Sequence, residues 1–171
     1  MRNTRHDHPA ALGLSERVLG GLRVLNIVYG LGVGALLIAS FLAPDFVFGA
    51  LDIDPDGGEI ATSSVRGIMV VGLAGAFVAH RILTGLLQIV ESVRAGDPFV
   101  VDNAERLQAL AWWLLGAELL HLVVGALARS ASFDIDWTFS FTPWIAVLLT
   151  FVLARVFAHG ARMRDDLEGT V

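Results

Sequence analysis

Cysteine and lysine are both absent from this chain of 171 residues, and only 17% of its residues are charged. Without cysteine, disulfide bonds, thiolate chemistry and cysteine-ligated metal sites are excluded. A soluble domain normally carries about 25% charged residues, so the low charge indicates that much of the surface does not face water. Hydrophobic residues make up 55% of the chain. This composition predicts an integral membrane protein.

The apolar residues form long runs, at 18–43, 65–90, 107–128 and 143–157. A helix of about 20 residues crosses a hydrocarbon core of about 30 Å. The first three runs reach that length, and the fourth reaches it if its helix continues past Arg155 and His159. We therefore expect an all-α membrane protein, an antiparallel bundle of four transmembrane helices. The expected segments are a flexible tail at 1–14, an N-cap at Ser15, and helices at 16–43, 65–95, 103–128 and 143–167.

The basic residues, all of them arginine, predict the orientation of the chain in the membrane. They gather in the N-terminal segment, at the edges of the hinge at 96–102, and in the C-terminal tail. The connections at 44–64 and 129–142 carry mainly acidic residues. Because positively charged connections stay on the cytoplasmic side, both termini and the hinge are expected to face the cytoplasm.

The stretch "RAGDPFVVDNAERL", residues 94–107, combines a signal that ends one helix with a signal that starts the next. Gly96 suits the left-handed position after a helix, and Pro98 cannot continue that helix. Asp102, followed by Glu105 three residues later, matches a capping box for the next helix. A connection this short predicts a tight antiparallel hairpin.

The segment 133–142, "FDIDWTFSFT", alternates apolar with polar residues, which is typical of a β-strand. A lone strand is not stable in water, so its partner would be "FVFGALDI" at 46–53. The sequence thus predicts a small two-stranded β cap outside the cytoplasm. An aromatic belt at the membrane surface, without strand pairing, is the alternative.

Five ionisable residues lie within the predicted spans: His80, Arg81, Glu118, His121 and Arg155. A charge at the bilayer centre costs about 2.5–3.5 kcal/mol on insertion scales, so it needs a partner or water. Counting from the two ends of the hinge places Arg81 and Glu118 at about 21 and 22 Å from the turn, nearly the same depth. We expect an ion pair between them, with Arg155 within about one turn of Glu118.

Three interpretations of this cluster are open. The first is an ion network that fixes the helix register. The second is transport, in which Glu118, His121 and His80 form a proton or ion path. The third is haem ligation by His80 and His121, although the same counting offsets the two imidazoles by about 4 to 5 Å. The sequence has no metal-ligand triplet, phosphate-binding loop or nucleophile motif, so we predict no cofactor, no enzymatic activity and no direct binding of nucleic acid.

Small residues within the first two spans favour close approach between helices. They are Gly30, Gly34, Gly72, Gly75 and Ala76. The same pattern would serve a contact within the chain or between two copies of it.

Two motifs recur in a known family. The hinge motif comprises Gly96, Pro98, Phe99, Asn103, Arg106 and Leu107, and the C-terminal stretch "LARVFAHGARMRDDLEGTV" contributes Val156, Phe157, Gly160, Asp166, Thr170 and Val171. On these residues the chain resembles the bacterial membrane family called domain-of-unknown-function family 2975. The resemblance implies a four-span protein of the bacterial inner membrane, of a kind often encoded beside small helix-turn-helix regulators. It implies no catalytic residues.

Together these features favour a non-enzymatic regulatory or accessory protein that acts through its cytoplasmic face. That face would combine the hinge motif with a C-terminal motif of Phe157, Gly160, Arg162 and Asp166. Its partners would be the lipid bilayer and either another protein or a second copy of the chain. A small proton-coupled transporter and a haem-binding electron carrier are the alternatives.

Overall fold

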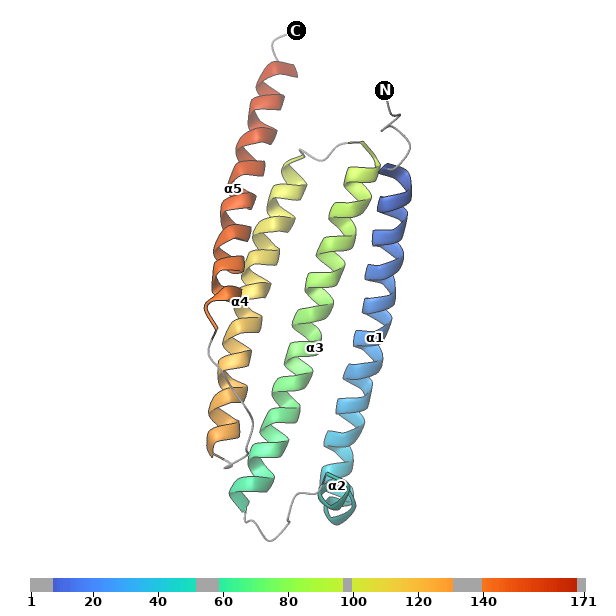
Figure 1. The fold of residues 1–171 in the computed structure, drawn as a ribbon, viewed down its shortest axis with the longest axis vertical. Coiled ribbons are helices and arrows are strands. Elements are labelled where there is room, and N and C mark those ends of the chain that lie inside the picture. Colours follow the sequence, from blue (N-terminus) through green and yellow to red (C-terminus); the bar gives the residue numbers. More distant parts are fainter. Residues whose placement is uncertain (1–7, 52–58, 97–99, 131–139, 169–171) are drawn as a thin grey trace.

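The computed structural model describes residues 8–51, 59–96, 100–130 and 140–168. Regular structure in these segments is entirely α-helical (Figure 1). The helices are α1 (His8–Leu42), α2 (Pro44–Ala50), α3 (Glu59–Arg94), α4 (Val101–Ser130) and α5 (Thr142–Glu168). The four long helices each contain a segment that is long and apolar enough to span a membrane, within Gly13–Leu42, Thr62–Arg94, Val101–Arg129 and Thr142–Arg164. The chain is therefore a multi-pass membrane protein.

The first helix starts earlier than the sequence predicted. α1 begins at His8, within the segment 1–14 that was expected to be a tail, and residues 1–7 lie outside the described residues. The predicted N-cap at Ser15 is wrong, because Ser15 lies inside the helix. The run of alanine and leucine before Ser15 has high helix propensity and continues the helix outward.

The four long helices lie in a single row, in the order α1, α3, α4, α5, with antiparallel neighbours (Figure 1). Within the described part of the chain, each long helix contacts only its neighbours in this row; α1 touches neither α4 nor α5, and α3 does not touch α5. The predicted antiparallel bundle is thus an open row. Both broad faces of α3 and α4 remain accessible, and α1 and α5 form the two edges.

Small residues bring α1 and α3 together, as the sequence predicted. A Cβ added at Gly30 would lie 3.5 Å from the Cβ of Ala76, and one added at Gly72 would lie 3.3 Å from the Tyr29 hydroxyl. The close approach also lets the side chain of Asn26 donate a hydrogen bond of 2.9 Å to the carbonyl of Ala76. This interface therefore combines van der Waals packing with a polar contact, as is common between membrane helices.

The row has its densest packing where α3, α4 and α5 meet. Leu107, Leu110 and Ala154 are buried there, and Phe157 packs against them. Gly85 lets α3 approach α4 closely at this point, because an added Cβ would lie 3.0 Å from a methyl carbon of Leu110 and that side chain would have to shift. The contact between Gly85 and Leu110 consequently sets the register of α3 against α4.

The predicted β cap is wrong where the structure can test it. Residues 46–50, expected to be a strand, belong to helix α2, which lies across the end of α1 (Figure 1). Val47 and Phe48 are adjacent in sequence and both are buried, whereas neighbouring residues of a strand point to opposite faces. Pro44 in the first turn and Asp45 after it favour a helix start. Most of the second predicted strand, residues 133–139, lies outside the described residues.

Helix α5 is shifted along the helix axis relative to α4. The rings of Trp112 and Phe151 pack edge to face, with centroids 5.2 Å apart. From this contact α4 extends eleven residues to its start at Val101, whereas α5 continues seventeen residues to Glu168. Both ends point the same way, so α5 projects past α4 by about 9 Å (Figure 1). We call this end of the row the hinge end and the opposite end the α2 end.

Candidate functional site

A buried polar group joins α3 to α4 at the hinge end. Asn103 is fully buried. Its Nδ2 donates a hydrogen bond of 2.6 Å to the Ser92 hydroxyl, and its Oδ1 accepts one of 2.9 Å from the Arg106 guanidinium. The Ser92 hydroxyl in turn donates to the carbonyl of Ile89 at 2.8 Å. We call Ser92, Asn103 and Arg106 the hinge node. It brings together two residues of the predicted hinge motif.

The hinge itself agrees with the sequence in part. Gly96 has a φ of +95°, as predicted for the residue that ends α3. The predicted capping box is wrong, because α4 starts at Val101 and Asp102 lies within its first turn. There Asp102 lies 3.9 Å from the guanidinium of Arg106, one turn along the helix. Pro98 and Phe99 of the motif are outside the described residues.

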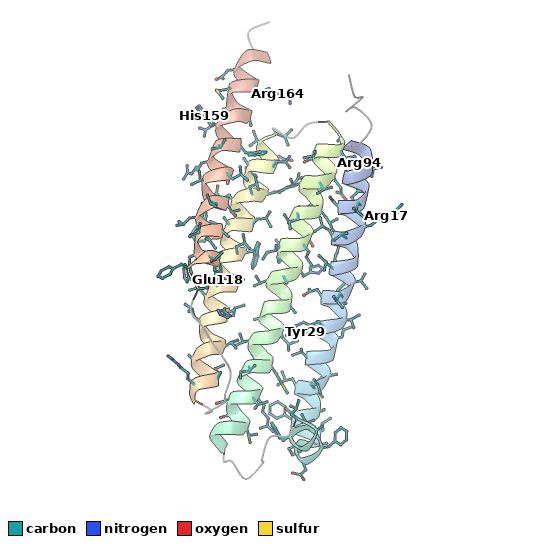
Figure 2. The ribbon with its side chains drawn as sticks, viewed as in Figure 1. Arg17, Tyr29, Arg94, Glu118, His159 and Arg164 are labelled. Carbon is teal, nitrogen blue, oxygen red and sulfur yellow. The ribbon has the colours of Figure 1, made fainter. Side chains whose placement is uncertain are left out.

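An ion pair ties α1 to this end of the row. The guanidinium of Arg94 donates to both carboxylate oxygens of Glu16, at 3.0 and 2.8 Å. The Arg94 side chain is 64% exposed, so the pair stabilises the fold by less than about 1 kcal/mol. It fixes the start of α1 next to the hairpin (Figure 2).

The predicted ion pair between Arg81 and Glu118 does not form in the described structure. Gly85 faces Leu110, so Arg81, four residues before Gly85, is level with Leu114. Glu118 lies four residues further along α4, about 6 Å away along the axis. The guanidinium of Arg81 instead lies over the ring of Trp113, 5.4 Å from its centroid. Counting from the ends of the hinge misplaced the register by about one turn.

Arg155 is also distant from Glu118. The Trp112–Phe151 contact makes Arg155, four residues beyond Phe151, level with Gln108. Glu118 lies ten residues further along α4, which corresponds to about 15 Å. Figure 2 shows Glu118 near the middle of the length of α4, where its side chain is half-buried. The displacement of α5 toward the hinge end accounts for this separation.

The two histidines of the predicted cluster lie apart as well. By the register of Gly85 against Leu110, His121 is level with Ala74, and His80 lies six residues from that level, about 9 Å along the axis. His121 lines a groove of about 400 Å³, which we call the wide groove. The floor of the groove is the small-residue face of α3 around Gly75. His121 belongs to the wall that α4 forms, and Asn26 and Tyr29 belong to the opposite wall, which α1 forms.

A second polar group, which sequence reasoning missed, lies at the α2 end. The guanidinium of Arg66 donates to the carbonyl of Ser40 at 2.6 Å and to its hydroxyl at 3.3 Å. The same guanidinium lies over the rings of Phe41 and Phe48, at 4.3 and 5.8 Å from their centroids. Ser40 and Phe48 are buried. This Arg66 node attaches α2 and the end of α1 to α3. The available signal was an arginine at the start of one apolar run and a serine at the end of another.

Comparison with known proteins adds the family. The family model described as "Protein of unknown function (DUF2975)" matches residues 21–171. The chain belongs to the DUF2975 family. No curated protein and no solved structure matches the chain.

The C-terminal motif of this DUF2975 protein spans two environments on α5. Phe157 is half-buried against the core, whereas Arg162 is exposed and donates from Nε to the carbonyl of Ala158 at 3.1 Å. Asp166 is exposed. The outward side of α5 borders an apolar depression of about 620 Å³. We call its lining the α5 outer face: Arg155, Val156, His159, Gly160, Met163 and Arg164.

Proposed function

We propose that this DUF2975 protein is a non-enzymatic regulatory or accessory protein of the bacterial cytoplasmic membrane. It binds a protein partner through the α5 outer face at the hinge end. The observation that carries the proposal is the exposed apolar and cationic character of the α5 outer face. Its last two residues, Met163 and Arg164, lie on the part of α5 that projects about 9 Å beyond α4 (Figure 1).

The side chains of the α5 outer face have the character of a recognition surface. Val156 is 57% exposed and Met163 is 51% exposed. The same face carries the cationic Arg155, together with Arg164 and the imidazole of His159, which Figure 2 labels. Methionine adapts its shape to a partner, and the arginines favour acidic groups. The partner that fits is an amphipathic helix that combines apolar and acidic residues.

The charge distribution supports a cytoplasmic hinge end. Arg17, Arg94, Arg106, Arg162 and Arg164 all lie near that end, and such positively charged ends face the cytoplasm. The chain has no cysteine, so Asp45→Cys and Asp166→Cys introduce single thiols at opposite ends. In intact spheroplasts a membrane-impermeant maleimide is expected to label the cysteine at 45 and to spare the one at 166. The reverse pattern would refute the orientation.

Partner binding is testable by photo-crosslinking in cells. A benzoyl-phenylalanine placed at Met163 is expected to yield a discrete crosslinked protein, and Arg164→Glu in the same chain should reduce its amount at least about tenfold, because a reversed charge repels an acidic partner. The matched control is Leu148, which is 65% exposed on the same helix but outside the face. Equal crosslinking from both positions would contradict the proposal.

A second candidate is proton-coupled transport through Glu118. It is favoured by one observation: this half-buried carboxyl group, midway along a membrane-spanning helix, forms no ion pair with any described residue. An ionisable group in such a place suggests a functional role. The haem alternative gains no support, because His80 and His121 are offset by about 9 Å.

Glu118→Gln separates transport from a structural role. Because no ion pair is lost, the free energy of unfolding in detergent is expected to change by less than about 0.5 kcal/mol. In proteoliposomes with an imposed pH gradient, a carrier would lose its proton flux in this variant. Flux equal to that of the unchanged protein would exclude Glu118 as the proton carrier, and a large loss of stability would restore the structural interpretation.

A further inference from the structure

A narrow groove lies between α3 and α4, nearer the hinge end than the wide groove. Its volume is about 110 Å³. The polar and aromatic residues that line it are Arg81, Thr84 and Gln88 of α3 and Arg106 and Trp113 of α4.

The narrow groove is cationic. Both of its ionisable residues are arginines, and no acidic residue lines it. Arg81 contacts the Trp113 ring and forms no ion pair within the described segments. Arg106 donates to Asn103, and the carboxylate that approaches it, Asp102, is 3.9 Å away on a side chain that is 75% exposed. The charge of Arg81 is therefore not neutralised by any described residue, and that of Arg106 is neutralised only in part.

Two of the polar residues of the groove, Arg106 and Gln88, lie at a depth that matches the boundary between headgroups and hydrocarbon. Arg106 is five residues from the start of α4, about 8 Å from the hinge end. Gln88 is level with it, because Ser92, four residues on, bonds to Asn103. Arg81 lies deeper, about 20 Å from the hinge end. A guanidinium at that depth is unfavourable unless it reaches water, a partner or a lipid headgroup.

We propose that the narrow groove binds the phosphate of an anionic phospholipid from the leaflet at the hinge end. Arg106 and the amide of Gln88 hold the phosphate oxygens, since charge-assisted hydrogen bonds to a guanidinium favour this group. Arg81, which lies deeper in the membrane, attracts the same negative charge. Ala109 and Leu110 complete the groove with an apolar wall, which suits the glycerol and the first acyl carbons. A lipid is the occupant because the groove lies between two membrane-spanning helices. Arg81, Gln88 and Ala109 are exposed there, so lipids of the surrounding bilayer can reach the groove.

The test uses the purified full-length chain in phosphatidylcholine nanodiscs, with phosphatidylglycerol added in steps. Native mass spectrometry counts the bound lipids, and the thermal midpoint reports the stabilisation that accompanies binding. The unchanged protein is expected to retain one phosphatidylglycerol and to show a higher midpoint. Arg81→Gln should weaken the apparent affinity about tenfold, because it removes a positive charge that attracts the phosphate across about 12 Å of a groove from which water is largely excluded.

Two further variants make the result specific. Arg23→Gln removes the same charge from an exposed position on α1 that does not line the groove, and it should bind phosphatidylglycerol like the unchanged protein. Ala109→Leu fills the groove at an exposed position without altering charge, and it should abolish binding while the protein still folds.

The proposal is overturned if Arg81→Gln and Ala109→Leu bind phosphatidylglycerol as the unchanged protein does. It is equally overturned if Arg23→Gln weakens binding as much as Arg81→Gln, since the effect would then be one of net charge. Inorganic phosphate, added to phosphatidylcholine nanodiscs, should leave the midpoint unchanged. A rise equal to that with phosphatidylglycerol would assign the groove to a soluble anion and would refute the lipid assignment.

Discussion

Asn103→Leu is expected to lower the free energy of unfolding by about 2–3 kcal/mol. The substitution removes a fully buried side chain that bonds to both Ser92 and Arg106. Each buried polar group that loses its partner costs about 1–3 kcal/mol, and a hydrogen bond between membrane helices contributes about 0.6 kcal/mol on average. The measurement is reversible unfolding of the detergent-solubilised protein, followed by circular dichroism.

The control for this variant is Gln108→Leu on the same helix. Gln108 is exposed, so an amide is replaced by the same apolar group without breaking the hinge node, and stability should change by less than about 0.5 kcal/mol. The double variant Ser92→Ala/Asn103→Leu should lose less stability than the sum of the two single variants, because both single variants remove the same interhelical bond. Equal stability of Asn103→Leu and Gln108→Leu would show that the node does not hold the hairpin.

Arg66→Met should destabilise the α2 end by about 2–4 kcal/mol and release α2 from α3. The variant keeps an apolar stem but loses the charged hydrogen bond to the Ser40 carbonyl, worth about 1.5–3 kcal/mol. It also loses the stacking on Phe41 and Phe48, worth about 0.5–2 kcal/mol. Hydrogen exchange of the α2 backbone amides reports the release, since those amides are protected only while the short helix is docked.

Arg17→Met is the matched control for the second variant. Arg17 is exposed near the other end of α1, as Figure 2 shows. The exchange of α2 should be unchanged in this control. If α2 exchanges at the same rate in Arg66→Met and in the unchanged protein, the Arg66 node does not anchor it.

Sequence reasoning was most successful where a single physical cause dominates. Long apolar runs can only be spans in a bilayer, so the four helices and their order were predictable. Gly96 was predictable too, because few residues other than glycine adopt a φ of +95°. The family assignment also followed from residues in the hinge and C-terminal motifs, and it is confirmed over residues 21–171.

Register was not predictable from the same information. Helix ends give only approximate levels, whereas the contact of Gly85 with Leu110 and the bond between Ser92 and Asn103 determine the register. An error of one turn is enough to separate Arg81 from Glu118. The Arg66 node was missed for a related reason: Ser40 and Arg66 are twenty-six residues apart, and only the fold of the intervening chain brings them together.

The side-by-side order of the helices has a consequence for cooperativity. Each interface between long helices in the row involves two helices alone. The free energy of unfolding should therefore be close to a sum of contributions from neighbouring pairs of helices, as in a repeat protein. Damage at the α1–α3 interface then leaves the α4–α5 interface intact, and an edge helix can detach while the other three stay folded. An edge helix is therefore expected to separate at a lower temperature than the α3–α4 pair at the centre of the row.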